Sequence, residues 1–322
     1  MMRVGVIGAG LMGHGIALTF ARAGHAVAVT DPSPEALAAL PARVRESAAT
    51  MGLDAGPLLA RITAVPTLAD AAREAGLIVE AAPERLDLKR RLFGELEAAA
   101  PPHALLASNT SALPITAIAE GLGTAHRAVG THWWNPPHLI PLVEVIRAAG
   151  TSDATMAATT ALLAAIGKTP VRVEKDVPGF IGNRLQHALW REAIALVETG
   201  VCDAASVDTV VKASFGRRLA TLGPLENADL VGLDLTLAIH ATLLRDLDAR
   251  PDPSPLLESL VADGHLGMRT NRGFRRWSPG AAEAARARIA RHLIALETLD
   301  CTRAREGAQT GGKHDHQTHL HH

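Results

Sequence analysis

The sequence is poor in the features that mark several special classes of protein. It contains only two cysteines, Cys202 and Cys301, which stand too far apart for a metal-ligand motif and fit a reducing, cytoplasmic location. The formal net charge of −1 gives no electrostatic reason to expect nucleic acid or an anionic membrane as a partner. No apolar run approaches the ~18 residues of a membrane-spanning helix, and the apolar segment of residues 4–7 is too short for a signal-peptide core. The expectation is therefore a cytoplasmic globular protein with no resident metal.

The remaining composition describes an ordinary folded chain. Of its 322 residues, 48% are hydrophobic and 20% are charged, and this length favours two domains over a single core. Residues 3–176 alternate short apolar segments with helical stretches, the pattern of an α/β domain of Rossmann type with a mostly parallel sheet covered on both faces. The expected strands are residues 3–7, 26–30, 77–82, 104–107, 128–132, 141–146 and 169–174.

The pattern changes after residues 175–179, where strands give way to helices. We therefore place a boundary near residue 177, with an α/β domain at 1–176 and an all-helical domain at 177–300. Residues 301–322 end in a histidine-rich tract, which could bind metal loosely but is more simply a disordered tail or an expression appendage. The helix expected at 181–199 has more apolar surface than one face packed against its own chain would bury. This predicts a homodimer built from the helices after residue 180.

The first chemical motif is a short apolar strand that runs directly into Gly8-x-Gly10-x-x-Gly13, followed by an alanine-rich helix. The first glycine makes a tight turn, the second lets backbone N–H groups approach a pyrophosphate, and the third lets the helix pack closely on the strand. The N-terminus of that helix offers unpaired N–H donors and a partial positive charge. Gly8, Gly10, Leu11, Met12 and Gly13 are therefore predicted to contact a dinucleotide.

The second strand of this unit ends in Asp31, roughly twenty residues past the glycines. A carboxylate there accepts hydrogen bonds from the ribose hydroxyls and repels a 2′-phosphate, which favours NAD over NADP. The structural alternative is that Asp31 only caps the helix that begins at the following Ser-Pro.

A second motif begins at His132, which ends a predicted strand, the edge of an open α/β sheet where ligands collect. Glu144 follows twelve residues later within an apolar strand, where a carboxylate needs a hydrogen-bonding partner. The Pro-Pro bend between them can fold the chain back, so that Glu144 orients a His132 imidazole that takes a hydroxyl proton. Alternatively, His132 is a surface or satisfied core residue and Glu144 faces water.

Three further strings bear on this interpretation: ASNTS at residues 107–111, PGFIGNR at 178–184 and GMRTNRGF at 267–274. Together with the glycine motif and the His132–Glu144 pair, they closely resemble the 3-hydroxyacyl-CoA dehydrogenase family in order and spacing. The resemblance covers about residues 3–278. It implies an NAD-dependent dehydrogenase in which residues 1–176 form the NAD-binding Rossmann domain and residues 177–300 form a helical substrate and dimerisation domain.

The resemblance also implies roles for individual residues. The family's catalytic histidine matches His132, and the glutamate that assists it matches Glu144. Ser111 matches the serine that hydrogen-bonds the substrate oxygen, and Asn183 matches the asparagine at the domain junction. Both would act as neutral donors to the developing carbonyl oxygen.

The family's cofactor residues match a second group of positions. Asp31 matches the ribose-binding acid, while Glu84 and Lys89 match a charged pair near the nicotinamide. Asn109 is assigned to the same cofactor site. The structural alternative is that Glu84 and Lys89, which are close to helical spacing, form only a surface ion pair.

The remaining matched residues also have structural alternatives. Ser111 or Thr110 could cap the helix that follows, and Asn183 could cap its own helix or lie on its surface. Trp133 and Trp134 are most simply packing residues whose indole N–H groups need partners.

The expected substrate class comes from features of this chain that match some branches of the family better than others. The interval between Asp31 and the strand at 77–82 is short and contains arginines but no lysine to hold a coenzyme A phosphate. The Pro83-Glu84 pair and the WNPPH run at 134–138 look more like branches that oxidise L-gulonate, L-carnitine or a pyridine carboxylate. We therefore expect NAD-dependent oxidation of a small hydroxy acid. The alternatives are a 3-hydroxyacyl-CoA such as 3-hydroxybutyryl-CoA, and a non-catalytic dinucleotide-binding protein.

Overall fold

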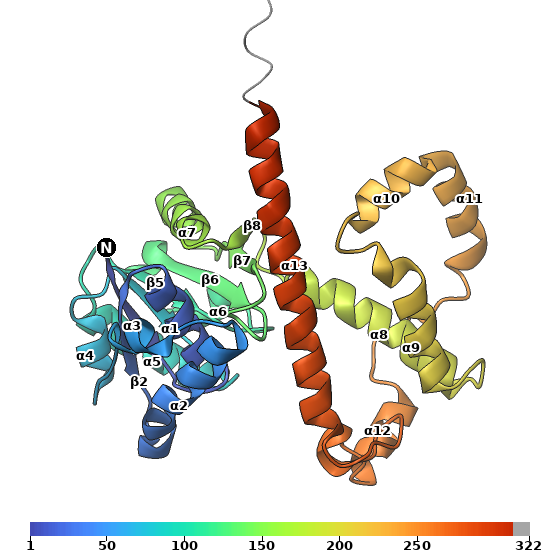
Figure 1. Cartoon of the computed structure of the whole chain (residues 1–322), viewed down its shortest axis with the longest axis horizontal. Helices are drawn as coiled ribbons and strands as arrows, with labels where there is room; N and C mark the ends of the chain where they lie inside the picture. Colours follow the sequence, from blue (N-terminus) through green and yellow to red (C-terminus); the bar gives the residue numbers. More distant parts are fainter. Residues whose placement is uncertain (312–322) are drawn as a thin grey trace, which may run out of the picture. The chain divides into compact units, whose positions relative to one another are not determined.

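The structure is a computed structural model that describes residues 1–311, with side chains described up to residue 299. The chain divides into two compact units, one formed by residues 1–183 with the chain from Arg288 onward, the other by Arg184–Ala287 (Figure 1). Helix α13 (Ala281–Gly311) continues into the segment predicted as a tail, and the histidine-rich residues 312–322 lie outside the described residues. Within residues 1–311, none of the helices is both long and apolar enough to span a bilayer.

The first unit is built on one eight-stranded sheet in the order β3-β2-β1-β4-β5-β6-β7-β8. Every neighbouring pair is parallel except the antiparallel pair β6–β7, so the predicted Rossmann-type, mostly parallel sheet is confirmed. The strand that the sequence did not predict is β3, a short edge strand with two exposed side chains. The strands are β1 (Arg3–Ile7), β2 (Ala26–Thr30), β3 (Ile62–Ala64), β4 (Leu77–Glu80), β5 (Leu105–Ser108), β6 (Ala128–Trp133), β7 (Leu142–Ile146) and β8 (Thr169–Val173).

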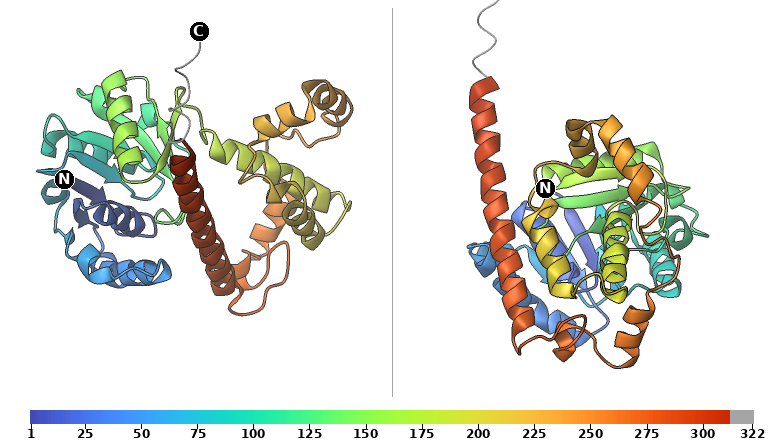
Figure 2. Two further views of the ribbon diagram at one scale, coloured as in Figure 1. Left: turned by 45° about the horizontal axis from the view of Figure 1, so that its top comes forward. Right: turned by 90° about the vertical axis from the view of Figure 1, so that its right-hand side faces the viewer.

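Helices cover both faces of this sheet because its central strands bury apolar side chains on each side (Figure 2). In β4, Leu77 and Val79 pack into one core cluster while Ile78 packs into the other. The first face is covered by α1 (Gly13–Arg22), α2 (Pro34–Thr50), α3 (Ala55–Leu59) and α7 (Asp153–Ala165), and the second by α4 (Leu68–Ala72), α5 (Leu86–Ala99) and α6 (Ile115–Ile118).

The second unit is helical, as predicted. Asp203 caps α9 by accepting a hydrogen bond from the Ser206 N–H, and Ser254 caps α12 in the same way through Leu257. None of the residues of α9–α12 is buried. The helices are α8 (Gly182–Glu198), which begins in the first unit, α9 (Ala204–Ala213), α10 (Pro224–Val231), α11 (Leu233–Leu243), α12 (Pro255–Ala262) and the first turns of α13.

A buried ion pair joins two strand ends to α5 inside the first unit. The Lys89 ammonium donates to both carboxylate oxygens of Glu80, at 2.8 and 3.1 Å, and the two side chains are 1% and 0% exposed. Glu80 also accepts hydrogen bonds from the Ser108 hydroxyl at 2.6 Å and the Ala82 N–H at 2.7 Å. These extra donors compensate the loss of water around the carboxylate, which makes the charge tolerable in the core.

The Glu80→Ala variant is expected to lose about 3–5 kcal/mol of unfolding free energy, because it leaves the Lys89 charge buried without its main partner. Urea unfolding measures the loss. The double variant Glu80→Leu/Lys89→Met should lose less than the single one, since no charge is then stranded. Asp87→Ala, which removes an exposed ion pair with Arg85, is the control and should change stability little. A single variant no worse than this control would contradict the argument.

Two histidines lie near each other where the turn after β6 packs against α1. The rings of His14 and His138 lie 6.1 Å apart, and the Lys168 ammonium donates to the carbonyl oxygens of Pro137 and Ile140 at 2.6 and 2.9 Å. Burial lowers the pKa of His138 to about 4, with smaller contributions from the nearby His14 and Lys168. Burial likewise lowers the pKa of His14. The folded chain therefore keeps this contact uncharged at neutral pH.

The depressed pKa of His138 predicts a loss of stability in acid. As pH falls from 6.5 toward about 4, the unfolded chain takes up a proton at this residue before the folded chain does, so the stability present above pH 6.5 is lost across that window. His138→Gln should flatten the fall in unfolding free energy between pH 7 and pH 5. Substitution of the exposed His103 by Gln provides the control. Equal pH dependence in His138→Gln and the parent would refute this assignment.

Candidate active site

The glycine motif lies at the turn between β1 and α1, at the carboxyl edge of the sheet. Gly8 has a φ of +112°, and a Cβ at Gly13 would lie 1.8 Å from the Gly8 carbonyl oxygen, so only glycine allows this turn and the close approach of α1. A Cβ at Gly10 would meet nothing within 4 Å. The first turn of α1 has neither an acidic residue nor a side-chain cap. This open side of the loop, with uncapped N–H groups, fits the pyrophosphate of NAD.

Asp31 lies beside this loop at the end of β2. One carboxylate oxygen accepts the Ala9 N–H at 2.7 Å, and the other accepts the Ser33 N–H at 2.9 Å. The helix cap of α2 is Ser33, whose hydroxyl accepts the Ala36 N–H at 3.1 Å. Asp31 is therefore tied to the glycine loop, whereas its alternative role as the helix cap belongs to Ser33.

The antiparallel pairing of β6 with β7 places His132 directly opposite Glu144. Their side chains meet, with His132 Nδ1 and Glu144 Oε2 2.7 Å apart, and both are buried. The rings of Trp134 and Phe180 flank the imidazole, with centroids at 5.3 and 5.5 Å. The structure thus brings the two predicted residues together in an apolar setting.

The second carboxylate oxygen of Glu144 accepts the N–H groups of Ile181 and Gly182, at 2.9 and 3.0 Å. These donors converge because Phe180 adopts a φ of +52°, an unusual conformation for a residue with a side chain. Burial alone would raise the pKa of Glu144, but the hydrogen bonds from His132 and the two N–H groups outweigh it and lower that pKa. Glu144 is therefore ionised at neutral pH.

Glu84 holds the loop that carries Ser111. Its Oε1 accepts the Thr110 hydroxyl at 2.5 Å and the N–H groups of Ser111 and Ala112 at 2.9 and 3.0 Å. Burial would raise the pKa of Glu84, but these donors and the Lys89 charge lower it. From the other side, the Asn183 amide donates to the Ser111 carbonyl oxygen at 2.8 Å. The loop is therefore fixed from both directions.

Several structural alternatives can now be compared with this geometry. Thr110, rather than Ser111, accepts the Leu113 N–H at 2.9 Å ahead of α6. Lys89 is buried and lies 3.5 Å from Glu84, so the two do not form a merely superficial pair. The Asn109 side chain points back into the fold, where its oxygen accepts a hydrogen bond from the backbone N–H of Trp133 at 2.9 Å.

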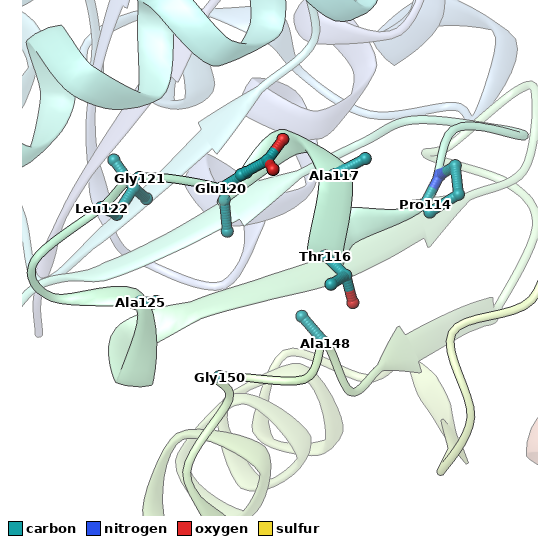
Figure 3. A pocket seen from close by; sticks show the side chains of 10 residues that line it. Pro114, Thr116, Ala117, Glu120, Gly121, Leu122, Ala125, Ala148 and Gly150 are labelled. Atoms are coloured by element: carbon teal, nitrogen blue, oxygen red, sulfur yellow. The ribbon is translucent and has the colours of Figure 1, made fainter.

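One prediction about the environment of these residues turns out differently, and the hollow found in the structure lies away from them. The indole N–H groups of Trp133 and Trp134 are buried and have no hydrogen-bond partner in the described part of the chain, although such groups usually find one. The hollow of about 500 Å³ between α6 and the turn after β7 is lined by none of the predicted site residues (Figure 3).

Sequence reasoning missed the local roles of two charged residues. Glu80 ends a fully buried strand, and a carboxylate at the end of the run Leu-Ile-Val-Glu was the available signal. Arg43 donates to the Ala9 carbonyl oxygen at 2.7 Å. Its position on the third turn of α2 has no motif that would have indicated this contact.

Comparison with known proteins agrees with this arrangement. The NAD-binding domain of 3-hydroxyacyl-CoA dehydrogenases matches residues 3–177, and their C-terminal domain matches residues 179–277. A 5-formyl-3-hydroxy-2-methylpyridine 4-carboxylate 5-dehydrogenase from Mesorhizobium japonicum is 35% identical over 302 residues, which are 92% of this chain and 97% of that protein. A probable 3-hydroxybutyryl-CoA dehydrogenase from Bacillus subtilis is 39% identical over 277 residues, or 84% and 95% of the two chains.

A solved structure gives the same picture. The crystal structure of a 5-formyl-3-hydroxy-2-methylpyridine 4-carboxylic acid 5-dehydrogenase, described as an NAD⁺-dependent dismutase, superimposes with a TM-score of 0.86 at 32% identity, covering 93% of this chain and 98% of that one. The two domains, the glycine loop and these matches lead to one conclusion: the chain belongs to the 3-hydroxyacyl-CoA dehydrogenase family and is an NAD-dependent dehydrogenase that acts on a CH–OH group.

Proposed function

We propose that the chain oxidises the hydroxyl group of a small free hydroxy acid, with His132 as the general base. The observation that carries this proposal is the buried contact of 2.7 Å between His132 Nδ1 and Glu144 Oε2. An alcohol that loses a hydride must also lose its hydroxyl proton, and an oriented neutral imidazole is suited to take it.

The hydrogen bonds around Glu144 define how the base works. Because Glu144 is ionised, His132 donates its Nδ1–H to it and keeps the lone pair of Nε2 for the substrate hydroxyl proton. The same carboxylate then stabilises the imidazolium that results. NAD, when bound, supplies the hydride acceptor. Acid–base assistance of this kind contributes about 10²–10⁴-fold in rate.

Ser111 and Asn183 are proposed to hold the substrate oxygen near His132. The Glu84 carboxylate accepts the backbone N–H of Ser111, and one N–H of the Asn183 side-chain amide donates to the Ser111 carbonyl oxygen. The Ser111 hydroxyl and the second amide N–H can then act as neutral donors whose positions are set before the substrate arrives. In this scheme Glu84 is a positioning residue.

For the cofactor, we propose that the glycine loop binds the pyrophosphate and Asp31 the adenosine ribose. Lys89 and Glu84 would border the nicotinamide end, since Glu84 contacts the same loop as Ser111. Asn109 would contribute indirectly by fixing the start of the turn after β6.

The preference for a free acid rests on the Pro83-Glu84 pair and the WNPPH run at 134–138, which resemble the branches of the family that oxidise free acids. The interval between β2 and β4 also contains no lysine to hold the phosphates of coenzyme A. The relative from M. japonicum, which spans nearly the whole chain, is named for a pyridine carboxylate. The relative from B. subtilis makes 3-hydroxybutyryl-CoA the rival substrate.

The substrate test compares gulonate, carnitine, pyridine-carboxylate alcohols and aldehydes, and 3-hydroxybutyryl-CoA with the purified chain. We expect turnover with at least one free acid, and no advantage for the thioester. For aldehydes, acid and alcohol products must be quantified as well as NADH, because dismutation of two aldehydes and one water into one acid and one alcohol leaves no net NADH. Turnover with the thioester alone would refute the preference.

His132→Asn should lower kcat by about 10²–10⁴-fold on the best substrate while the Kd for NADH stays unchanged. The exposed His126, substituted by Asn, serves as the control. A parent protein that binds NADH but turns over none of these compounds would instead support a non-catalytic dinucleotide-binding role.

We further propose a homodimer formed through the second unit. Its helices present many large apolar side chains to solvent, more than a lone folded chain normally leaves uncovered. We propose that a second copy of the chain covers these side chains, because none of the residues of α9–α12 is buried within the chain itself. The most exposed examples are Leu225, Leu230, Leu233 and Leu237, at 80%, 72%, 63% and 71%.

Sedimentation at micromolar concentration is expected to show a dimer. Leu237→Glu should shift the protein toward monomer, because a charge would be buried in the proposed interface. Val171→Glu places the same charge at an exposed apolar position of β8 and should leave the dimer intact. A monomeric parent would rule out the proposal.

A further inference from the structure

Arg43 is a charged residue that contacts the glycine loop and to which the family resemblance assigns no role. It lies on α2, and its guanidinium donates to the Ala9 carbonyl oxygen at 2.7 Å. The N–H of the same Ala9 is held by Asp31 at 2.7 Å. A cation and an anion therefore each bind the backbone of Ala9, one at its carbonyl oxygen and the other at its N–H.

Within residues 1–299, the Arg43 guanidinium forms no ion pair with a carboxylate. Among the described side chains, no carboxylate lies within 4.0 Å of its guanidinium, although the side chain is half-buried. The Ala9 carbonyl uses one of five N–H donors and carries no charge. The guanidinium is thus held in place by a neutral group, with donors and charge left over.

The nearby groups indicate which ligand that charge suits. The first turn of α1 has no acidic residue. His14 is buried, which lowers its pKa; the charge of Arg43 lowers it further and outweighs the opposite effect of the Glu46 carboxylate. The loop therefore combines uncapped N–H groups with an unpaired guanidinium, an environment that favours a phosphate. Asp31, bound to the same Ala9, argues against a 2′-phosphate at this place because it would repel one.

We propose that Arg43 binds the adenosine half of NAD through the charge of its phosphate. Its hydrogen bond to Ala9 sets the guanidinium at the loop before the cofactor arrives. This assignment is independent of the roles proposed for His132 and Glu144, and it holds whichever hydroxy acid is the substrate.

The test compares Arg43→Gln with Arg45→Gln. Arg45 lies two residues further along the same helix and is exposed, so its removal changes net charge without touching the loop. Dissociation constants are measured for NADH, NADPH, ADP-ribose and reduced nicotinamide mononucleotide at low and moderate salt. In Arg43→Gln, the Kd for NADH and for ADP-ribose should rise about tenfold, the lower range for a hydrogen bond to a charged group. The mononucleotide should bind as before.

Salt dependence and a conservative variant separate charge from structure. Binding of ADP-ribose to the parent should weaken with salt more than binding to Arg43→Gln, and Arg43→Lys should recover most of the affinity. If Arg43→Gln does not fold, the Lys variant and the salt dependence of the parent still decide the question.

Three outcomes would overturn the proposal. The first is NADH affinity equal to that of Arg45→Gln, which would mean that the charge is unused. The second is an equal loss for the mononucleotide, which would indicate general damage to the loop. The third is a loss confined to NADPH, which would assign Arg43 to a 2′-phosphate.

Discussion

The hydrogen bonding of one buried carboxylate organises the candidate active site of this protein. Glu144 is acceptable in an apolar strand only because three donors surround it: the His132 imidazole and the N–H groups of Ile181 and Gly182. Two of these donors come from the segment where the Rossmann domain ends, and the third comes from the neighbouring strand. The path of the chain at residues 180–182 and the orientation of the imidazole are thus set by the same side chain.

A second buried carboxylate supports the adjacent edge. Glu80 binds Lys89 and Ser108, and Lys89 also lies near Glu84, which in turn holds the loop of Ser111. Side chains from β4, β5 and α5 therefore form one connected set of polar contacts under the site. Such a set is stable only when each member is satisfied, which explains why carboxylates, an ammonium and hydroxyls occur together in an otherwise apolar core.

The sequence indicated much of this arrangement through patterns that repeat along the chain. The glycine spacing, the alternation of strands and helices, and the switch to helices after residue 177 predicted the architecture, because each reflects local geometry. The edge strand β3 escaped prediction because its three residues bury little apolar surface. The spacing of His132 and Glu144 suggested a pairing, but only the antiparallel register of β6 and β7 shows that they face each other.

Contacts between distant segments were harder to predict. Glu80 could be read as the end of a strand but not as the partner of Lys89, and Arg43 looked like one of several arginines on a polar helix. The contact of Glu80 with Lys89 and that of Arg43 with Ala9 depend on how α5 and α2 pack on the sheet. The spacing of residues along the sequence does not specify that packing.

The unusual φ of Phe180 has a wider consequence. It turns two successive amides toward Glu144, so a change in backbone path at this point would withdraw both and leave the carboxylate with the imidazole alone. The hydrogen bonding of the Glu144 carboxylate is in this way tied to the backbone conformation of a single residue, and a substitution that drives position 180 out of the left-handed region would alter it without touching His132 itself.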